Sequence, residues 1–202
     1  MMKVIGLTGP SGAGKGSIAS LFASYGVPSI DTDAVYRALL IPPSPCLLEL
    51  RERFGDEILS EDGTLNRPAL AARVFAPGQE EELRDLNRIS HRYVLEEVRR
   101  RLVCCETEGA PAVLVDAPQL FESGFDAECH RILAILAPRD LRLARIMERD
   151  SLDLPRAEAR LNAAHPDEFF RTHADAVLVN DKALSDLRKD VERLLADWEV
   201  IL

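Results

Sequence analysis

Short apolar runs alternate along the chain with longer stretches in which apolar residues recur every three or four positions. Five of these runs have the length of a buried strand and lie at residues 3–8, 27–31, 112–116, 132–137 and 176–179. Helical spacing is clearest over residues 138–149 and 183–198. Strands that alternate with helices predict an α/β fold with a parallel five-stranded sheet flanked by helices on both faces.

Two segments interrupt this alternation. Residues 46–108 have helical spacing throughout, with turn signals only around 55–66 and at Pro77-Gly78. Residues 151–172 are polar and contain two prolines. We therefore predict a nucleotide-binding core (1–45, 109–150 and 173–202), a helical substrate-binding insertion (46–108) and a small lid (151–172).

The charge balance excludes some classes of function. The chain carries 34 acidic and 25 basic residues, which gives a net charge of −9. This balance argues against nucleic acid or a membrane surface as a partner. No apolar stretch approaches the ~20 residues of a membrane-spanning helix, and the first apolar run is too short for a signal peptide. We expect a cytoplasmic protein.

Four cysteines occur, and their spacing fits neither a disulfide framework nor a zinc site. None form a C-x-x-C pair, and Cys104 and Cys105 are adjacent. We interpret all four as free thiols in a reducing compartment, with a redox switch as the alternative.

A glycine-rich loop follows the first predicted strand and opens the first predicted helix. It comprises Gly9, Pro10, Ser11, Gly12, Ala13, Gly14, Lys15, Gly16 and Ser17. Glycines let successive backbone N–H groups point at phosphates, the helix N-terminus adds its positive dipole end, and Lys15 reaches the β- and γ-phosphates. A glycine-rich turn with a solvated lysine is the alternative. The strand–loop–helix context favours ATP binding and phosphoryl transfer.

Gly16 departs from the usual form of this loop. A serine or threonine normally follows the lysine, and its hydroxyl binds Mg²⁺. Here the Ser17 hydroxyl would bind Mg²⁺, either directly or through a water molecule. The Gly-Lys-Gly-Ser form is typical of small-metabolite kinases such as adenylate and cytidylate kinases.

Acidic residues end two of the predicted strands. Asp31 and Asp33 follow the second strand, where ligands bind to open parallel sheets. We predict that Asp33 accepts or positions the proton of an attacking hydroxyl, while one of the two aspartates caps a helix over residues 34–40. Asp116 ends the third strand. It either belongs to the coordination shell of Mg²⁺ or caps the strand end.

Three arginines share one face of the helix predicted over residues 138–149. Arg142, Arg145 and Arg149 fall at positions i, i+3 and i+7. They form either a phosphate clamp or a solvated, salt-bridged face. The polar segment that follows favours the clamp, beneath a lid that closes over ATP.

Together these motifs resemble the dephospho-CoA kinase family, over about residues 3 to 198. The most specific marks are Asp31-Thr32-Asp33 with Arg37, Phe54-Gly55-Asp56-Glu57-Ile58, Asp62-Gly63-Thr64-Leu65-Asn66-Arg67, Asp116-Ala117-Pro118-Gln119-Leu120-Phe121-Glu122, Arg149-Asp150, Arg160 and Val179-Asn180-Asp181. The resemblance implies Mg²⁺-assisted phosphorylation of the ribose 3′-hydroxyl of dephospho-CoA by ATP, which is the last step of coenzyme A biosynthesis. It also implies that the helical insertion cradles the CoA moiety.

The resemblance assigns roles to residues of this chain. The catalytic residues would be Lys15, Asp33 and Arg145, and Arg149 and Asn180 would join the loop in binding nucleotide. The substrate-binding residues would be Asp31, Asp33, Arg37, His91, Pro118 and Leu120, and the metal ligands Ser17 and Asp116. His91 has an equally good interpretation as a structural residue of its helix. The partners are small molecules, and we expect a monomer or a small homo-oligomer.

The sequence departs from the family pattern at four positions. Gly16 replaces serine, Arg92 follows His91 where proline is usual, Gln119 replaces leucine and Ala164 replaces a lid glutamine. Two other functions therefore stay open. One is a nucleoside monophosphate kinase of the adenylate or cytidylate type, and the other is a nucleotide-binding regulator with little turnover.

Overall fold

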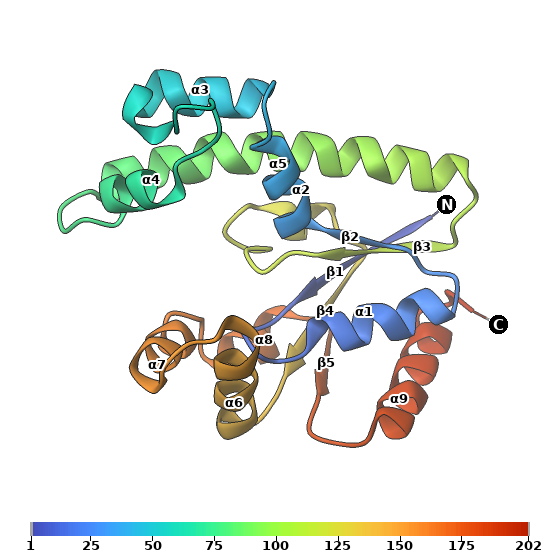
Figure 1. Ribbon diagram of the computed structural model, residues 1–202. Coiled ribbons are helices and arrows are strands. Elements are labelled where there is room, and N and C mark those ends of the chain that lie inside the picture. The colour runs from blue at the N-terminus through green and yellow to red at the C-terminus, as the bar shows by residue number, and fades with distance from the viewer. Residues whose placement is uncertain (1, 202) are drawn as a thin grey trace. The chain divides into compact units, whose positions relative to one another are not determined.

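In a computed structural model, which describes residues 2–201, the chain forms the predicted parallel sheet. The strands are β1 (Lys3–Thr8), β2 (Ser29–Asp31), β3 (Ala112–Asp116), β4 (Arg131–Leu136) and β5 (Ala176–Val179). They lie in the order β2-β3-β1-β4-β5, and every neighbouring pair is parallel (Figure 1). Their continuous apolar runs are explained by burial on both faces of the sheet.

Helices cover both faces of this sheet. Helices α1 (Lys15–Ser24) and α9 (Leu184–Asp197) pack on one face and α8 (Asp167–His173) on the other. The remaining elements of this part of the chain are α6 (Arg139–Asp150), α7 (Leu154–Asn162) and a short 3₁₀ helix at Phe125–Glu128. Leu133 and Ile135 of β4 belong to the core cluster that α1 and α9 complete with Phe22 and Leu187. The alternate residues of β4 pack against Phe170 of α8. Successive side chains of one strand thus face opposite helical layers.

The chain divides into two compact units, and the second runs from Thr32 to Arg101. The first unit ends at Asp31 and resumes at Leu102. The helices that contribute to the second unit are α2 (Thr32–Leu39), α3 (Pro45–Phe54), α4 (Arg67–Val74) and α5 (Glu80–Thr107), with a 3₁₀ turn at Asp56–Ile58. This unit has its own buried cluster, which includes Leu50, Phe54 and Ile89.

Capping side chains fix the starts of two helices in the second unit. The Ser44 hydroxyl accepts a hydrogen bond from the backbone N–H of Leu47 at 3.1 Å, and the Asn66 side chain accepts one from Ala69 at 3.1 Å. Each cap is followed by proline within the first two helical positions. Proline is tolerated there because these N–H groups have no partner within the helix.

The longest helix, α5, spans Glu80–Thr107 and is amphipathic. It buries Ile89, Val94 and Val98. Glu97 accepts hydrogen bonds from two arginines one turn further on, and these lower its pKa to about 2. No helix among the described residues is long and apolar enough to cross a membrane.

Two predicted element boundaries differ from the structure by two residues, whereas those of β4, α6 and α9 differ by one. The second strand is three residues long and begins at Ser29, because Pro28 has no N–H for the ladder and contributes only its carbonyl, which accepts from Leu114. The helix expected over residues 34–40 begins at Thr32. Asp33 therefore lies inside the first helical turn, and Asp31 is the aspartate that directly precedes the helix.

The four cysteines are free thiols, as the sequence indicated. Burial is the main reason why the pKa of Cys129 rises to about 12 and that of Cys46 to about 11. Thiols with such high pKa values stay protonated near neutral pH and react slowly.

Candidate active site

Three glycines shape the loop between β1 and α1. Gly9, Gly12 and Gly14 have φ angles of 134°, 79° and 90°. A Cβ atom would lie 2.2 Å from the Ile135 carbonyl oxygen at Gly9 and 2.1 Å from the Asn180 Nδ2 at Gly14. Only glycine fits these positions, because both the backbone conformation and the lack of space exclude a side chain. The resulting loop runs into the N-terminus of α1, the geometry that binds phosphate.

Side chains from three distant segments meet at this loop. Lys15, the first residue of α1, extends its Nζ back to the Gly9 carbonyl at 3.1 Å. Arg145 of α6 donates to the carbonyl oxygens of Gly12 at 3.3 Å and Ala13 at 3.4 Å. The loop thus has two cations beside it, held by elements that the sheet fixes in place.

The residue that follows β5 completes this arrangement. Asn180 is buried, and its Nδ2 donates to the Ala13 carbonyl at 2.8 Å. The main-chain carbonyl of Asn180 accepts a hydrogen bond from the Arg145 guanidinium at 3.3 Å. Loop, helix α6 and the end of β5 are thereby joined by one hydrogen-bond network.

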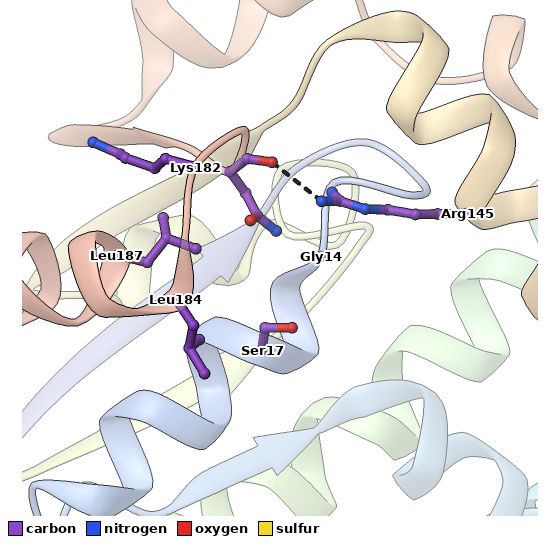
Figure 2. Close-up of a pocket in the computed structure, with 7 residues that line it drawn as sticks. Gly14, Ser17, Arg145, Lys182, Leu184 and Leu187 are labelled. Atoms are coloured by element: carbon purple, nitrogen blue, oxygen red, sulfur yellow. Dashed lines mark hydrogen bonds between the residues drawn. The ribbon is translucent and has the colours of Figure 1, made fainter.

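A cavity of about 270 Å³ opens beside these residues (Figure 2). It is lined by Gly14, Ser17, Arg145, Asn180, Lys182, Leu184 and Leu187. Apolar and polar groups are combined in the way that suits a planar base and a sugar. Lys182 extends away from Gly14 in this view and pairs with Asp190 of α9 at 2.6 Å.

Three of the residues that line the cavity were not predicted from the sequence, namely Lys182, Leu184 and Leu187. Leu184 is 57% exposed although it is apolar, and only the structure reveals this exposure. Leu187 also belongs to the main core, so the helical pattern accounts for it without a ligand.

The three arginines of α6 do not form one clamp. Arg142 is buried, and its guanidinium donates to the Ser11 carbonyl and to Asp167. Arg149 is exposed and reaches the Ser11 hydroxyl at 3.4 Å. Helical spacing correctly places all three on one side of α6. Because that side packs against the loop, Arg142 is buried, whereas Arg145 and Arg149 stay accessible.

Asp150, at the C-terminal end of α6, accepts hydrogen bonds from two arginines. Arg149 donates to it at 2.8 Å, and Arg160 of α7 does so at 2.8 Å. The hydrogen bond from Arg149 is the largest cause of the lowered pKa of this carboxyl group. Asp150 therefore stays ionised and holds two arginines together near the loop.

Two of the predicted acids are neighbours at the carboxyl edge of the sheet. Asp31 of β2 and Asp116 of β3 are paired in register, and Asp116 is also paired with Leu7 of β1. Ala112 and Leu114 face the core that contains α1, so strand alternation places Asp116 on the same face. This carboxylate thus lies on the side of the sheet that the loop and α1 occupy.

The site's suitability for Mg²⁺ rests on oxygen ligands. The described residues contain no group of three or more His, Cys, Asp or Glu that could hold a metal. Mg²⁺ needs no such cage, because it is commonly held by one or two protein oxygens, water and substrate phosphates. The exposed Ser17 hydroxyl and the Asp116 carboxylate are of this type. A side chain at Gly16 would enter open space.

The predicted acceptor-side residues are divided between the two units. Asp33 and Arg37 are exposed one turn apart on α2, whose last residue, Leu39, packs against the second unit's core. His91 is a partly buried residue of α5 in the same unit.

Pro118 and Leu120 follow β3 in the first unit. Pro118 is exposed, whereas Leu120 is fully buried. The methyl groups of Leu120 fill the space beside Gly6. A substrate contact from Leu120 would therefore involve its main chain.

A five-stranded parallel sheet with a glycine loop between its first strand and first helix defines the P-loop kinase fold. The structure matches that of a Thermus thermophilus protein with a TM-score of 0.82, 33% identity and coverage of 97% of both chains. It matches the dephospho-CoA kinase of Campylobacter jejuni with a TM-score of 0.69, 25% identity and coverage of 98% and 97%. Shikimate kinase from Acinetobacter baumannii, at 20% identity and a TM-score of 0.55, shares the fold.

Comparison of sequences defines the family. Residues 3–186 match the family model for dephospho-CoA kinase. The chain is 40% identical over 197 residues to the dephospho-CoA kinase of Anaeromyxobacter dehalogenans, covering 97% of this chain and 92% of the relative. It is 37% identical over 193 residues to that of Corynebacterium efficiens, covering 96% of each. The chain belongs to the dephospho-CoA kinase family.

Proposed function

We propose that this protein transfers the γ-phosphoryl group of ATP to the ribose 3′-hydroxyl of dephospho-CoA, giving coenzyme A and ADP in the cytoplasm. The observation that carries the proposal is the phosphate loop and its partners Lys15, Arg145 and Asn180 in a chain of this family. Phosphoryl transfer depends mainly on positioning and on stabilising negative charge. The loop and its two cations supply both.

The two cations would act at different places on the transferred group. Lys15 lies at the N-terminus of α1, where backbone N–H groups and the helix dipole add to its charge. Arg145 approaches the loop from α6 and carries a planar fork that suits phosphate oxygens. On ATP binding, we infer that both exchange loop carbonyls for phosphate oxygens and stabilise charge that develops in the transition state.

Asp33 would orient the acceptor hydroxyl and take its proton. It follows the carboxyl end of β2 by two residues and is exposed in the first turn of α2. A carboxylate in this position can hold a hydroxyl in line with the γ-phosphorus. Arg37, one turn later, would bind an anionic part of the substrate, and His91 would contact it from α5.

Ser17 and Asp116 would hold Mg²⁺ together with phosphate oxygens and water. The bound ion would supply neutralisation of charge on the β- and γ-phosphates. Asp31, the register neighbour of Asp116, would orient water in the same shell. Residues 46–108 would cradle the CoA moiety, and residues 151–172 would form the lid.

Restoring a hydroxyl at position 16 tests this metal assignment. We expect Gly16→Ser to lower the Mg²⁺ concentration that gives half-maximal activity, because a Cβ at this position meets no atom within 4 Å. Gly16→Ala is the matched control, since it adds the Cβ without the oxygen. Titration of activity with Mg²⁺ at saturating ATP measures the effect. An identical Mg²⁺ dependence in both variants and the parent would show that the missing hydroxyl is irrelevant.

An acceptor profile tests the proposed activity. ADP formation should be fast with dephospho-CoA, and slow with AMP, with CMP and without acceptor. Preference for CMP or AMP would instead indicate a nucleoside monophosphate kinase. Tight ATP binding with no acceptor-dependent ADP would indicate a nucleotide-binding regulator.

A further inference from the structure

Arg142 is the one charged side chain that is buried among the residues the structure describes. Only 6% of its surface is exposed, and burial lowers the pKa of its guanidinium. Burying a charge is costly unless its donors are paired. The partners of Arg142 therefore indicate what this buried cation holds together.

Its two partners belong to different parts of the first unit. Nε donates to the Ser11 carbonyl of the phosphate loop at 3.2 Å, and Nη1 donates to Asp167 Oδ1 at 3.2 Å. The backbone at Arg142 also lies directly against the loop, since a Cβ on Gly12 would come within 2.5 Å of the Arg142 carbonyl oxygen. Any shift of this guanidinium would therefore act on the loop.

Asp167 is the first residue of α8, and α8 follows α7 after a short connection. Helix α7 itself rests on α6, where Ala157 and Leu161 pack against Ile146. Arg142 thus joins α8 directly to the phosphate loop, whereas α7 is connected to the loop less directly, through Arg160, Asp150 and Arg149.

We propose that Arg142 is a positioning residue that couples α8 to the phosphate loop, so that Asp167 affects ATP affinity without touching ATP. The planar fork of arginine can serve two acceptors at once, and here it holds the Ser11 carbonyl and Asp167 in fixed relation. Asp167 is 45% exposed, so its contact can break when α8 moves. This inference rests on the proposed function only in that the loop binds ATP.

Asp167→Asn tests the coupling, and Glu168→Gln is the matched control. Both remove a carboxylate from the first turn of α8, but only Asp167 contacts Arg142. We expect Asp167→Asn to raise the Kd of a fluorescent ATP analogue and the KM for ATP about fivefold, the scale of one partly exposed ion pair. The KM for dephospho-CoA should match that of the control, whereas the melting temperature should be somewhat lower, because the buried Arg142 loses its carboxylate partner.

Arg142→Lys separates positioning from general stability. A lysine carries one point charge and cannot bridge both acceptors in this geometry, so it should weaken ATP binding as Asp167→Asn does. The double variant should then bind ATP no worse than either single variant. Additive losses, or equal Kd values for Asp167→Asn and Glu168→Gln, would overturn the proposal. So would a parallel rise in both KM values. Because the Kd is measured without acceptor, these outcomes are independent of the acceptor's identity.

Discussion

Replacing Lys15 by alanine is expected to lower kcat for dephospho-CoA phosphorylation by about 10²-fold or more, the scale of one preorganised electrostatic contact. Negative charge on the transferring phosphoryl group would then lose a cation that the start of α1 places at the loop. Lys15 is only partly buried and lies outside the main hydrophobic core cluster, so the fold should survive. Initial rates of ADP formation at saturating substrates measure the effect.

Lys189→Ala provides the matched control for Lys15→Ala. Lys189 is an exposed lysine of α9 that pairs with Asp186 at 3.3 Å, and it lies outside the cavity. Its removal should leave kcat within about twofold, as is usual for surface substitutions. A Lys15→Ala enzyme with the kcat of this control would show that phosphoryl transfer does not depend on Lys15.

Asp33→Asn should also reduce kcat steeply while leaving ATP affinity nearly unchanged. Asparagine preserves the size of the side chain and one acceptor oxygen, but it removes the charge and the basicity. The loss should be on the order of 10²- to 10⁴-fold, the range for a positioned general base. The measurement pairs kcat for dephospho-CoA with the Kd of an ATP analogue.

Asp31→Asn is the control for Asp33→Asn, because it neutralises the acid that pairs in register with Asp116. It should shift Mg²⁺ dependence more than kcat at saturating Mg²⁺. If Asp33→Asn kept a normal kcat and Asp31→Asn lost activity, the roles assigned to the two residues would have to be exchanged. Normal turnover by both would mean that other residues position the acceptor.

The strands were predictable because each is a short apolar run buried on both faces. The bounds of β1, β3 and β5 agree with the sequence pattern to the residue. The start of α2 was missed, since Asp31-Thr32-Asp33 has the composition of a helix cap, whereas the helix already includes Thr32 and Asp33. The first residue of a helix depends on which side chain caps it, and the composition of the segment does not determine that choice.

The phosphate loop could be located from its motif, but its surroundings could not. Spacing places Arg142 and Arg145 on one side of a helix, yet it does not reveal that the loop covers Arg142 and leaves Arg145 beside the cavity. Asn180 follows β5, which is separated from β1 only by β4 in the sheet. Its side chain can therefore reach Ala13 in the loop that follows β1. These contacts join residues more than 130 positions apart, so they follow from topology.

The most direct test of the account is to determine where the phosphate goes. Purified protein should be incubated with ATP, Mg²⁺ and dephospho-CoA, and the product analysed by phosphorus NMR and by co-elution with coenzyme A. We predict one new phosphomonoester, on the ribose 3′-hydroxyl, formed in equal amount to ADP, and formed far more slowly by Asp33→Asn. Phosphate on another position, or ADP formed with no phosphorylated dephospho-CoA, would contradict it.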